Sequence, residues 1–148
     1  MNTEKKLKKL VAIMAVALLA ISTTGASAAT KVTVTPQFKV SHTKSEVVLS
    51  FKGLPTAHGI YVTQCMAPKK GKAPTSCDPS ETSKVWISNL AADQKTGATS
   101  GSGKVTMKVD AYFKGGDCIH TTCVLYVTSD HNAPTDRSED QAIPFSFS

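Results

Sequence analysis

The chain has 148 residues with 17 basic and 11 acidic side chains and a formal charge of +6, which is enough for one domain with a hydrophobic core. Without the four lysines and the glutamate of its first nine residues, the formal charge falls to +3. So small an excess excludes the densely basic composition that is typical of dedicated nucleic-acid-binding proteins.

The N-terminus has the pattern of a secretory signal peptide. Lysines at positions 5 to 9 precede an apolar run over residues 10–21, and Ala26-Ser27-Ala28 supplies a small-residue cleavage site. The alternative is an uncleaved anchor, but the apolar run is short for a membrane span. We therefore expect residues 1–28 to be removed and residues 29–148 to form one secreted domain, with no membrane attachment after cleavage.

The rest of the chain is patterned as strands and turns. Alternating or β-branched apolar runs, separated by Gly, Pro and polar turn residues, predict seven short strands. These cover residues 31–35, 46–51, 59–66, 84–88, 104–110, 123–128 and 141–147. No segment after the signal has a convincing helical period, and Pro144 predicts that the last strand lies at an edge or a bulge. We predict an all-β, seven-stranded antiparallel Greek-key sandwich of immunoglobulin type.

Four cysteines, Cys65, Cys77, Cys118 and Cys123, fall at the ends of predicted strands. In an exported chain they predict two disulfides, for which three pairings exist. Pairing within each local pair is the simplest. The alternative is a metal site on Cys118, His120 and Cys123, but these spacings fit no structural zinc pattern, and we expect no metal.

Two polar features are weak signals of nucleic-acid binding and of catalysis. Lys69, Lys70 and Lys72 lie in a Pro- and Gly-rich loop; they could touch phosphates, but no aromatic residue is interleaved to stack on bases. The prediction is a solvated loop with, at most, weak and salt-sensitive DNA contacts. The four histidines lie in polar turns and no nucleophile elbow is present, so we expect no enzyme.

Several short motifs resemble the neocarzinostatin family of small secreted actinobacterial apoproteins. They are Gln64-Cys65, Cys77-Asp78-Pro79, Asp117-Cys118 with Cys123, and the closing Ile143-Pro144-Phe145-Ser146-Phe147. The resemblance extends from Val32 to the end of the chain. It implies an immunoglobulin-like sandwich and the bonds Cys65–Cys77 and Cys118–Cys123. It also implies an antibiotic, antimicrobial apoprotein whose cleft carries an enediyne chromophore that cleaves DNA once released.

The sequence departs from the family where the ligand walls are expected. Met66 and Ala67 stand where the family has a large aromatic residue after the Gln-Cys pair. Ser80-Glu81-Thr82 follows Cys77-Asp78-Pro79, where the family has a Phe. The aromatic ribbon before the third cysteine is reduced to residues 111–117. An apolar pocket needs such walls to bury its ligand.

The candidate ligand site lies between the two disulfide-closed loops. Alternation puts Gln64 and Met66 on the same face of one strand, and Tyr126 and Thr128 on the same face of another. We expect these four side chains to form one surface. Tyr112 and Phe113 are expected to close one side. The predicted function is a monomeric, non-enzymatic, secreted binding protein for a small apolar ligand, with no cofactor beyond a non-covalent chromophore. The alternative is an extracellular or cell-envelope interaction module that keeps the sandwich and has lost the cleft.

Overall fold

The computed structural model describes residues 28–42 and 45–148. The predicted signal peptide, apart from Ala28, lies outside the described residues. Within the described part of the chain, no helix has the length and apolar character needed to cross a membrane.

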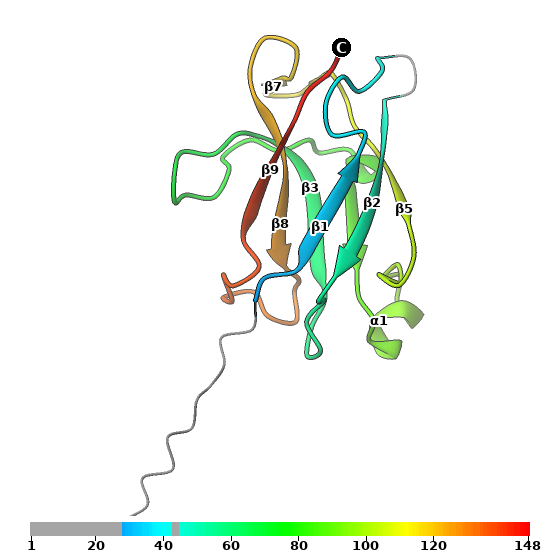
Figure 1. Ribbon diagram of the computed structural model, residues 1–148. Coiled ribbons are helices and arrows are strands. Elements are labelled where there is room, and N and C mark those ends of the chain that lie inside the picture. Colours follow the sequence, from blue (N-terminus) through cyan, green and yellow to red (C-terminus); the bar gives the residue numbers. More distant parts are fainter. Residues whose placement is uncertain (1–27, 43–44) are drawn as a thin grey trace, which may run out of the picture.

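Seven strands form two antiparallel sheets (Figure 1). The three-stranded sheet has the order β1 (Lys31–Thr35), β2 (Glu46–Lys52) and β5 (Val105–Lys108). The four-stranded sheet has the order β4 (Lys84–Ile87), β3 (Ile60–Met66), β8 (Cys123–Ser129) and β9 (Gln141–Phe145). The predicted seven-stranded immunoglobulin-like sandwich is confirmed, and β9 with its Pro144 lies at a sheet edge as expected.

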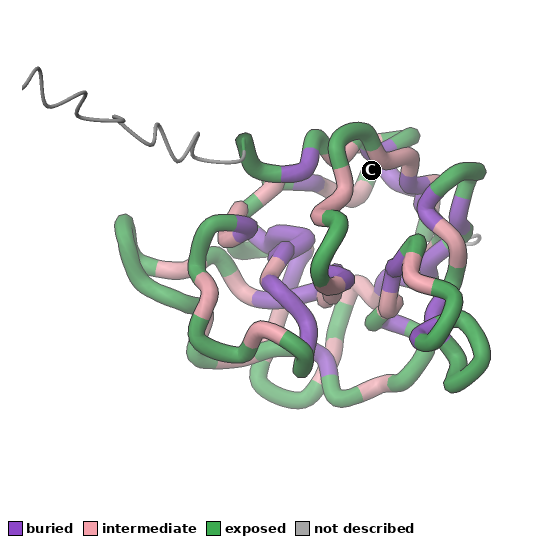
Figure 2. Tube along the Cα trace, turned by 90° about the horizontal axis from the view of Figure 1, so that it is seen from below, coloured by how far each residue is buried: buried purple, intermediate pink, exposed green. Residues whose placement is uncertain are grey.

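The core fills the space between the two sheets. Each strand contributes alternate side chains to it, as the pleat requires. Val47 and Leu49 of β2 and Met107 of β5 face Val62 of β3 and Leu125 of β8, and all five are buried. Seen from one end, the buried segments lie inside and the exposed loops outside (Figure 2).

Both local disulfides are confirmed. Cys65 is bonded to Cys77 and Cys118 to Cys123, with Cα–Cα distances of 3.9 and 5.3 Å. Because every cysteine is oxidised, none is available as a thiolate ligand. The described residues hold no cluster of three or more metal-ligating side chains.

Four short elements were not expected from the sequence. They are η1 (Glu81–Ser83), α1 (Ala91–Lys95) and a hairpin of β6 (Tyr112–Phe113) and β7 (Gly116–Asp117). The expectation that no segment would be helical is therefore wrong for Ala91–Lys95. This helix has five residues, too few to show a hydrophobic period, and it is held by Asp93, whose Oδ2 accepts a 2.7 Å hydrogen bond from Ser88 Oγ.

Candidate functional site

The outer faces of the two sheets differ in chemistry. On the three-stranded sheet the outward residues are mostly polar: Lys31, Thr33, Glu46, Ser50, Lys52, Thr106 and Lys108. On the four-stranded sheet the outward residues include a stripe of apolar and aromatic side chains: Tyr61, Cys65, Trp86, Val124, Tyr126, Ala142 and Pro144. Antiparallel sheets usually present a polar face to water, so the second face is the candidate for binding.

A concavity of about 600 Å³ lies on this outer face; we call it the outer-face concavity. Val124 and Tyr126 of β8 and Ala142 and Pro144 of β9 form its floor, and the segment Ala67–Lys72 forms a wall. Thr122, Arg137 and Asp140 complete the lining. Val124 and Tyr126 are buried and make a small apolar cluster with Cys65, separate from the core between the sheets.

The wall belongs to a loop, residues 67–76, that projects beside β9 (Figure 1); we call it the lysine loop. Its base is fixed on both sides. The Cys65–Cys77 bond closes it, Met66 N–H donates to Ser76 O at 2.9 Å, and Ala67 N–H donates to Thr122 O at 3.1 Å. These contacts fix the base of the lysine loop, which stands out from the sheet (Figure 1).

A polar corner closes one end of the outer-face concavity. The Tyr126 hydroxyl donates a 3.0 Å hydrogen bond to Asp140 Oδ2, and Arg137 Nη2 pairs with the same carboxylate and lies 3.4 Å from the Tyr126 hydroxyl. Burial, followed by the hydrogen bond to Asp140 and that residue's charge, raises the pKa of Tyr126, so the phenol keeps its proton. Among the described residues, the buried Asp140 Oδ1 has no hydrogen-bond partner.

Of the six residues expected to bind a ligand, only Tyr126 lines this concavity. The strand register explains part of the difference. Tyr126 lies opposite Thr63, and Gln64 lies opposite Leu125. The expectation that Gln64, Met66, Tyr126 and Thr128 form one surface is therefore wrong, because Gln64 and Met66 lie on the inner face of the sheet and Tyr126 and Thr128 on the outer face.

Gln64 instead connects β3 to the chain ahead of the β6–β7 hairpin. Its side chain is fully buried; the amide Nε2 donates to Asp110 O at 2.6 Å and to Cys118 Sγ at 3.2 Å, and Asp110 N–H donates to Gln64 Oε1 at 2.7 Å. With these groups satisfied, Gln64 has the geometry of a structural residue.

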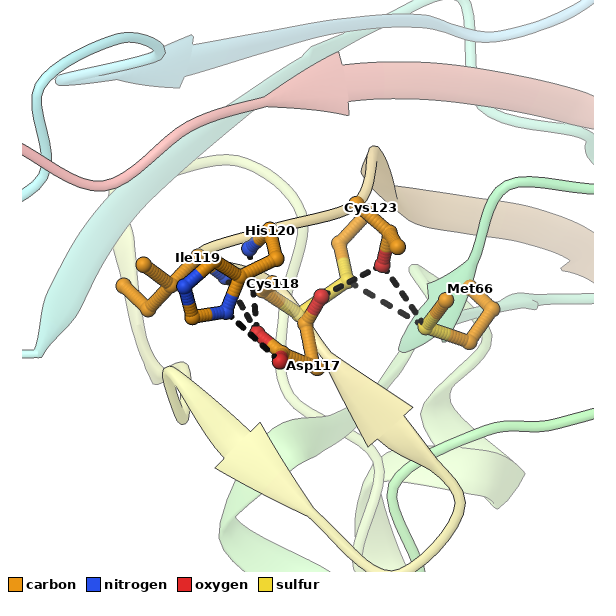
Figure 3. A network of polar contacts seen from close by, with 7 residues as sticks. Met66, Asp117, Cys118, Ile119, His120 and Cys123 are labelled. Atoms are coloured by element: carbon orange, nitrogen blue, oxygen red, sulfur yellow. Dashed lines mark hydrogen bonds and ion pairs between the residues drawn. A yellow bond between two sulfur atoms is a disulfide. The ribbon is translucent and has the colours of Figure 1, made fainter.

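The remaining expected residues do not gather at one place. Met66 lies at the Cys118–Cys123 loop, Tyr112 and Phe113 form β6 of the hairpin, and Thr128 lies near the opposite end of β8. Met66 Sδ lies 3.7 Å from Cys123 Sγ, beside the Cys118–Cys123 bond (Figure 3). Tyr112 is 60% exposed, whereas Phe113 packs on the core and over Gly116. Thr128 is half-buried opposite Tyr61.

The Asp117–His120 pair in Figure 3 resembles part of a catalytic triad. His120 Nδ1 lies 2.8 Å from Asp117 Oδ2, while Asp117 Oδ1 accepts hydrogen bonds of 3.0 Å from the backbone N–H groups of Ile119 and His120. The hydrogen bond from the His120 side chain, followed by the backbone bonds, lowers the pKa of Asp117. Thr121 Oγ1 bonds to the backbone carbonyl of Asp117 rather than to the imidazole, so this hydroxyl is not aligned as a nucleophile and the Asp117–His120 pair fixes a turn.

Sequence reasoning identified the three lysines only as a solvated loop, yet Lys69, Lys70 and Lys72 all line the outer-face concavity. It missed Val124, Arg137, Asp140, Ala142 and Pro144. Val124 and Tyr126 lie two residues apart on β8 and both face outward, so this apolar pair was the sequence signal that could have indicated the concavity. Arg137 and Asp140 come from an irregular segment for which the sequence carries no comparable pattern.

No known family model matches the sequence, and neither does any curated protein. Among solved structures, the chain is similar to macromomycin, with a TM-score of 0.51 and 24% identity over 81% of this chain and 100% of that one. At this identity the similarity shows the fold alone, and it supports the neocarzinostatin-like sandwich expected from the motifs.

Proposed function

We propose that this protein is a secreted, non-enzymatic binding protein that holds a small apolar ligand, without covalent attachment, in the outer-face concavity. The observation that carries the proposal is the apolar floor of Val124, Tyr126, Ala142 and Pro144 beneath a fixed wall. Its volume, about 600 Å³, falls in the range typical of small-molecule sites, roughly 300–1,000 Å³.

The fold supports the same proposal. The macromomycin-like sandwich agrees with the family that the sequence motifs resemble, whose members carry apolar chromophores. In this chain the ligand would rest on β8 and β9 against the lysine loop, and the aromatic walls that the sequence lacks are partly replaced by Tyr126 and by the loop. Any effect on DNA would come through the ligand.

The proposal is tested with N-phenyl-1-naphthylamine, an uncharged apolar fluorescent probe, titrated into the folded protein. Ala142 is exposed, lies on the floor and faces outward opposite Tyr126. Ala142→Gln places a polar group over the floor and should weaken probe binding. The matched control is Thr106→Gln, an exposed position on the outer face of the other sheet, which should leave probe binding unchanged. Equal probe affinity in both variants, or no binding to wild type, would contradict the proposal.

One observation favours the alternative of an extracellular interaction module. The same outer face continues from the concavity to Tyr61, Trp86 and His131, whose rings lie 4.8 to 6.2 Å apart. A shallow aromatic surface of this kind suits a macromolecular partner. If wild type binds no small apolar probe, this function is favoured over ligand carriage.

A further inference from the structure

We infer that the ligand of the outer-face concavity is an organic acid: a compact apolar body that bears one anionic group. This inference rests on the proposed function and adds the charge of the ligand to it. The reason is the distribution of charge around the concavity, which is strongly one-sided although the whole chain after the expected cleavage has a formal charge of only +3.

Four cations and one carboxylate line the concavity. The cations are Lys69, Lys70, Lys72 and Arg137, and the carboxylate is Asp140. Asp140 already pairs with Arg137 and accepts the hydrogen bond from Tyr126, so it offers little to neutralise the loop. In the described part of the chain no ion pair engages the three lysines, and their positive charge is left without a counter-charge in the protein.

The positions of these charges define how an acid would lie. The apolar floor is on β8 and β9, while the lysines are exposed on the loop at one side. An apolar body resting on Val124, Ala142 and Pro144 would point its anionic group toward the lysine loop and away from Asp140. Lysine ammonium groups on flexible stems can reach such a group from several directions.

The same charges do not suit a nucleic acid. Three lysines in one loop and one arginine supply few phosphate contacts, and the surface beneath them is a concavity rather than a track that follows a polymer. The one aromatic ring in its lining, Tyr126, is buried, so the concavity itself offers no exposed ring for base stacking. A small acid uses both the cations and the apolar floor.

A pair of probes with one skeleton tests the inference. 8-Anilino-1-naphthalenesulfonate differs from N-phenyl-1-naphthylamine by one sulfonate, and the uncharged probe is the more hydrophobic. Simple apolar partition therefore favours the uncharged probe. If the lysine loop selects acids, wild type should bind the sulfonate about tenfold more tightly at low salt, equivalent to about 1.4 kcal/mol. This preference should shrink in 1 M salt, where charges are screened within roughly 3 Å.

The critical variant is the triple replacement Lys69→Gln, Lys70→Gln and Lys72→Gln. It should abolish the preference for the sulfonate while leaving the affinity for the uncharged probe nearly unchanged. The control replaces Lys31, Lys52 and Lys104 by Gln. These lysines are exposed and lie outside the concavity's lining, so the control removes the same net charge and should keep the preference.

The outcomes separate the two proposals. If the uncharged probe binds at the concavity but the sulfonate binds no better, or if both triple variants behave alike, the acid inference is overturned and the proposed function stands. If neither probe binds to folded wild type, the proposed function fails and the inference fails with it. Circular dichroism and Trp86 fluorescence of each variant establish that the folded protein is being titrated.

Discussion

Asp130 provides the sharpest test of how the four-stranded sheet is held together. Its carboxylate is buried just after β8, and Oδ2 accepts hydrogen bonds of 2.9 Å from Gly59 N–H, ahead of β3, and 2.9 Å from Trp86 Nε1 on β4. Asn132 N–H donates to Oδ1 at 2.9 Å. One side chain therefore connects three neighbouring strands at one end of the sheet.

Asp130→Ala removes the acceptor for all three of these donors at once, of which the Asn132 N–H belongs to an exposed residue. A buried donor left unpaired costs about 1–3 kcal/mol. Gly59 is buried, whereas the Trp86 indole is half-buried and can recruit water. We therefore expect the free energy of unfolding to fall by about 2–4 kcal/mol, a large share of the roughly 5–15 kcal/mol of a typical domain.

Urea unfolding followed by fluorescence measures this loss directly, because Trp86 is the single tryptophan of the chain. The control is Asp136→Ala in the same connection, where the carboxylate makes more exposed contacts with Ser138 N–H and His58; its loss of stability should be clearly smaller than that of Asp130→Ala. An equal loss of unfolding free energy in the two variants would refute the argument that Asp130 stabilises the sheet because it is buried and connects three strands.

Four further predictions follow from individual contacts. Burial raises the pKa of Asp130, but hydrogen bonds from Trp86, Asn132 and Gly59 outweigh this effect and hold the pKa below its ordinary value of 3.8. The stability that these bonds give is present above pH 3.8 and is lost as the pH falls through the lower pKa of the folded state. Acid unfolding of Asp130→Asn should therefore be less steep than that of wild type. Gly59→Ala should lower the free energy of unfolding by about 1–3 kcal/mol, because the new Cβ would lie 2.5 Å from Ile87 O. Gly103→Ala has open space around the new Cβ and should leave the free energy of unfolding nearly unchanged in the same urea assay. Glu139→Ala should cost about 1–3 kcal/mol, because the buried Thr30 N–H donates to Glu139 Oε2 at 2.7 Å, and Glu139→Gln should recover part of the loss by keeping an acceptor. If DNA binds at all, replacing Lys69, Lys70 and Lys72 by Ala should reduce the slope of log affinity against log salt by about 3 in filter-binding titrations, and tight binding that resists high salt would contradict this.

The strands were predictable because their patterns are local. Val105 and Met107 alternate with polar neighbours, and both lie in the core between the sheets. Pro144 predicted an edge strand because it cannot donate to a ladder. The local disulfides also followed from short separations of 12 and 5 residues.

The site was less predictable because it depends on register between strands far apart in the sequence. Alternation says that Gln64 and Met66 share a face, and that Tyr126 and Thr128 do, but it does not say whether the two faces coincide. A shift of one residue exchanges the faces. In the structure Cys123 pairs with Met66, which puts the two pairs on opposite sides of the sheet.

The location of the proposed site follows from what the fold leaves uncovered. The space between the sheets is filled by fully buried side chains such as Leu49, Met107 and Leu125, so no ligand can enter there without displacing the core. β8 nevertheless carries buried apolar residues on both faces, a pattern typical of strands covered by a layer on each side. Among the described residues no third layer of sheet or helix lies over Val124 and Tyr126, so these two buried side chains are covered by loops rather than by a regular element. An apolar ligand in the concavity would therefore cover mainly Ala142 and Pro144, which are exposed on β9 beside the buried Val124 and Tyr126.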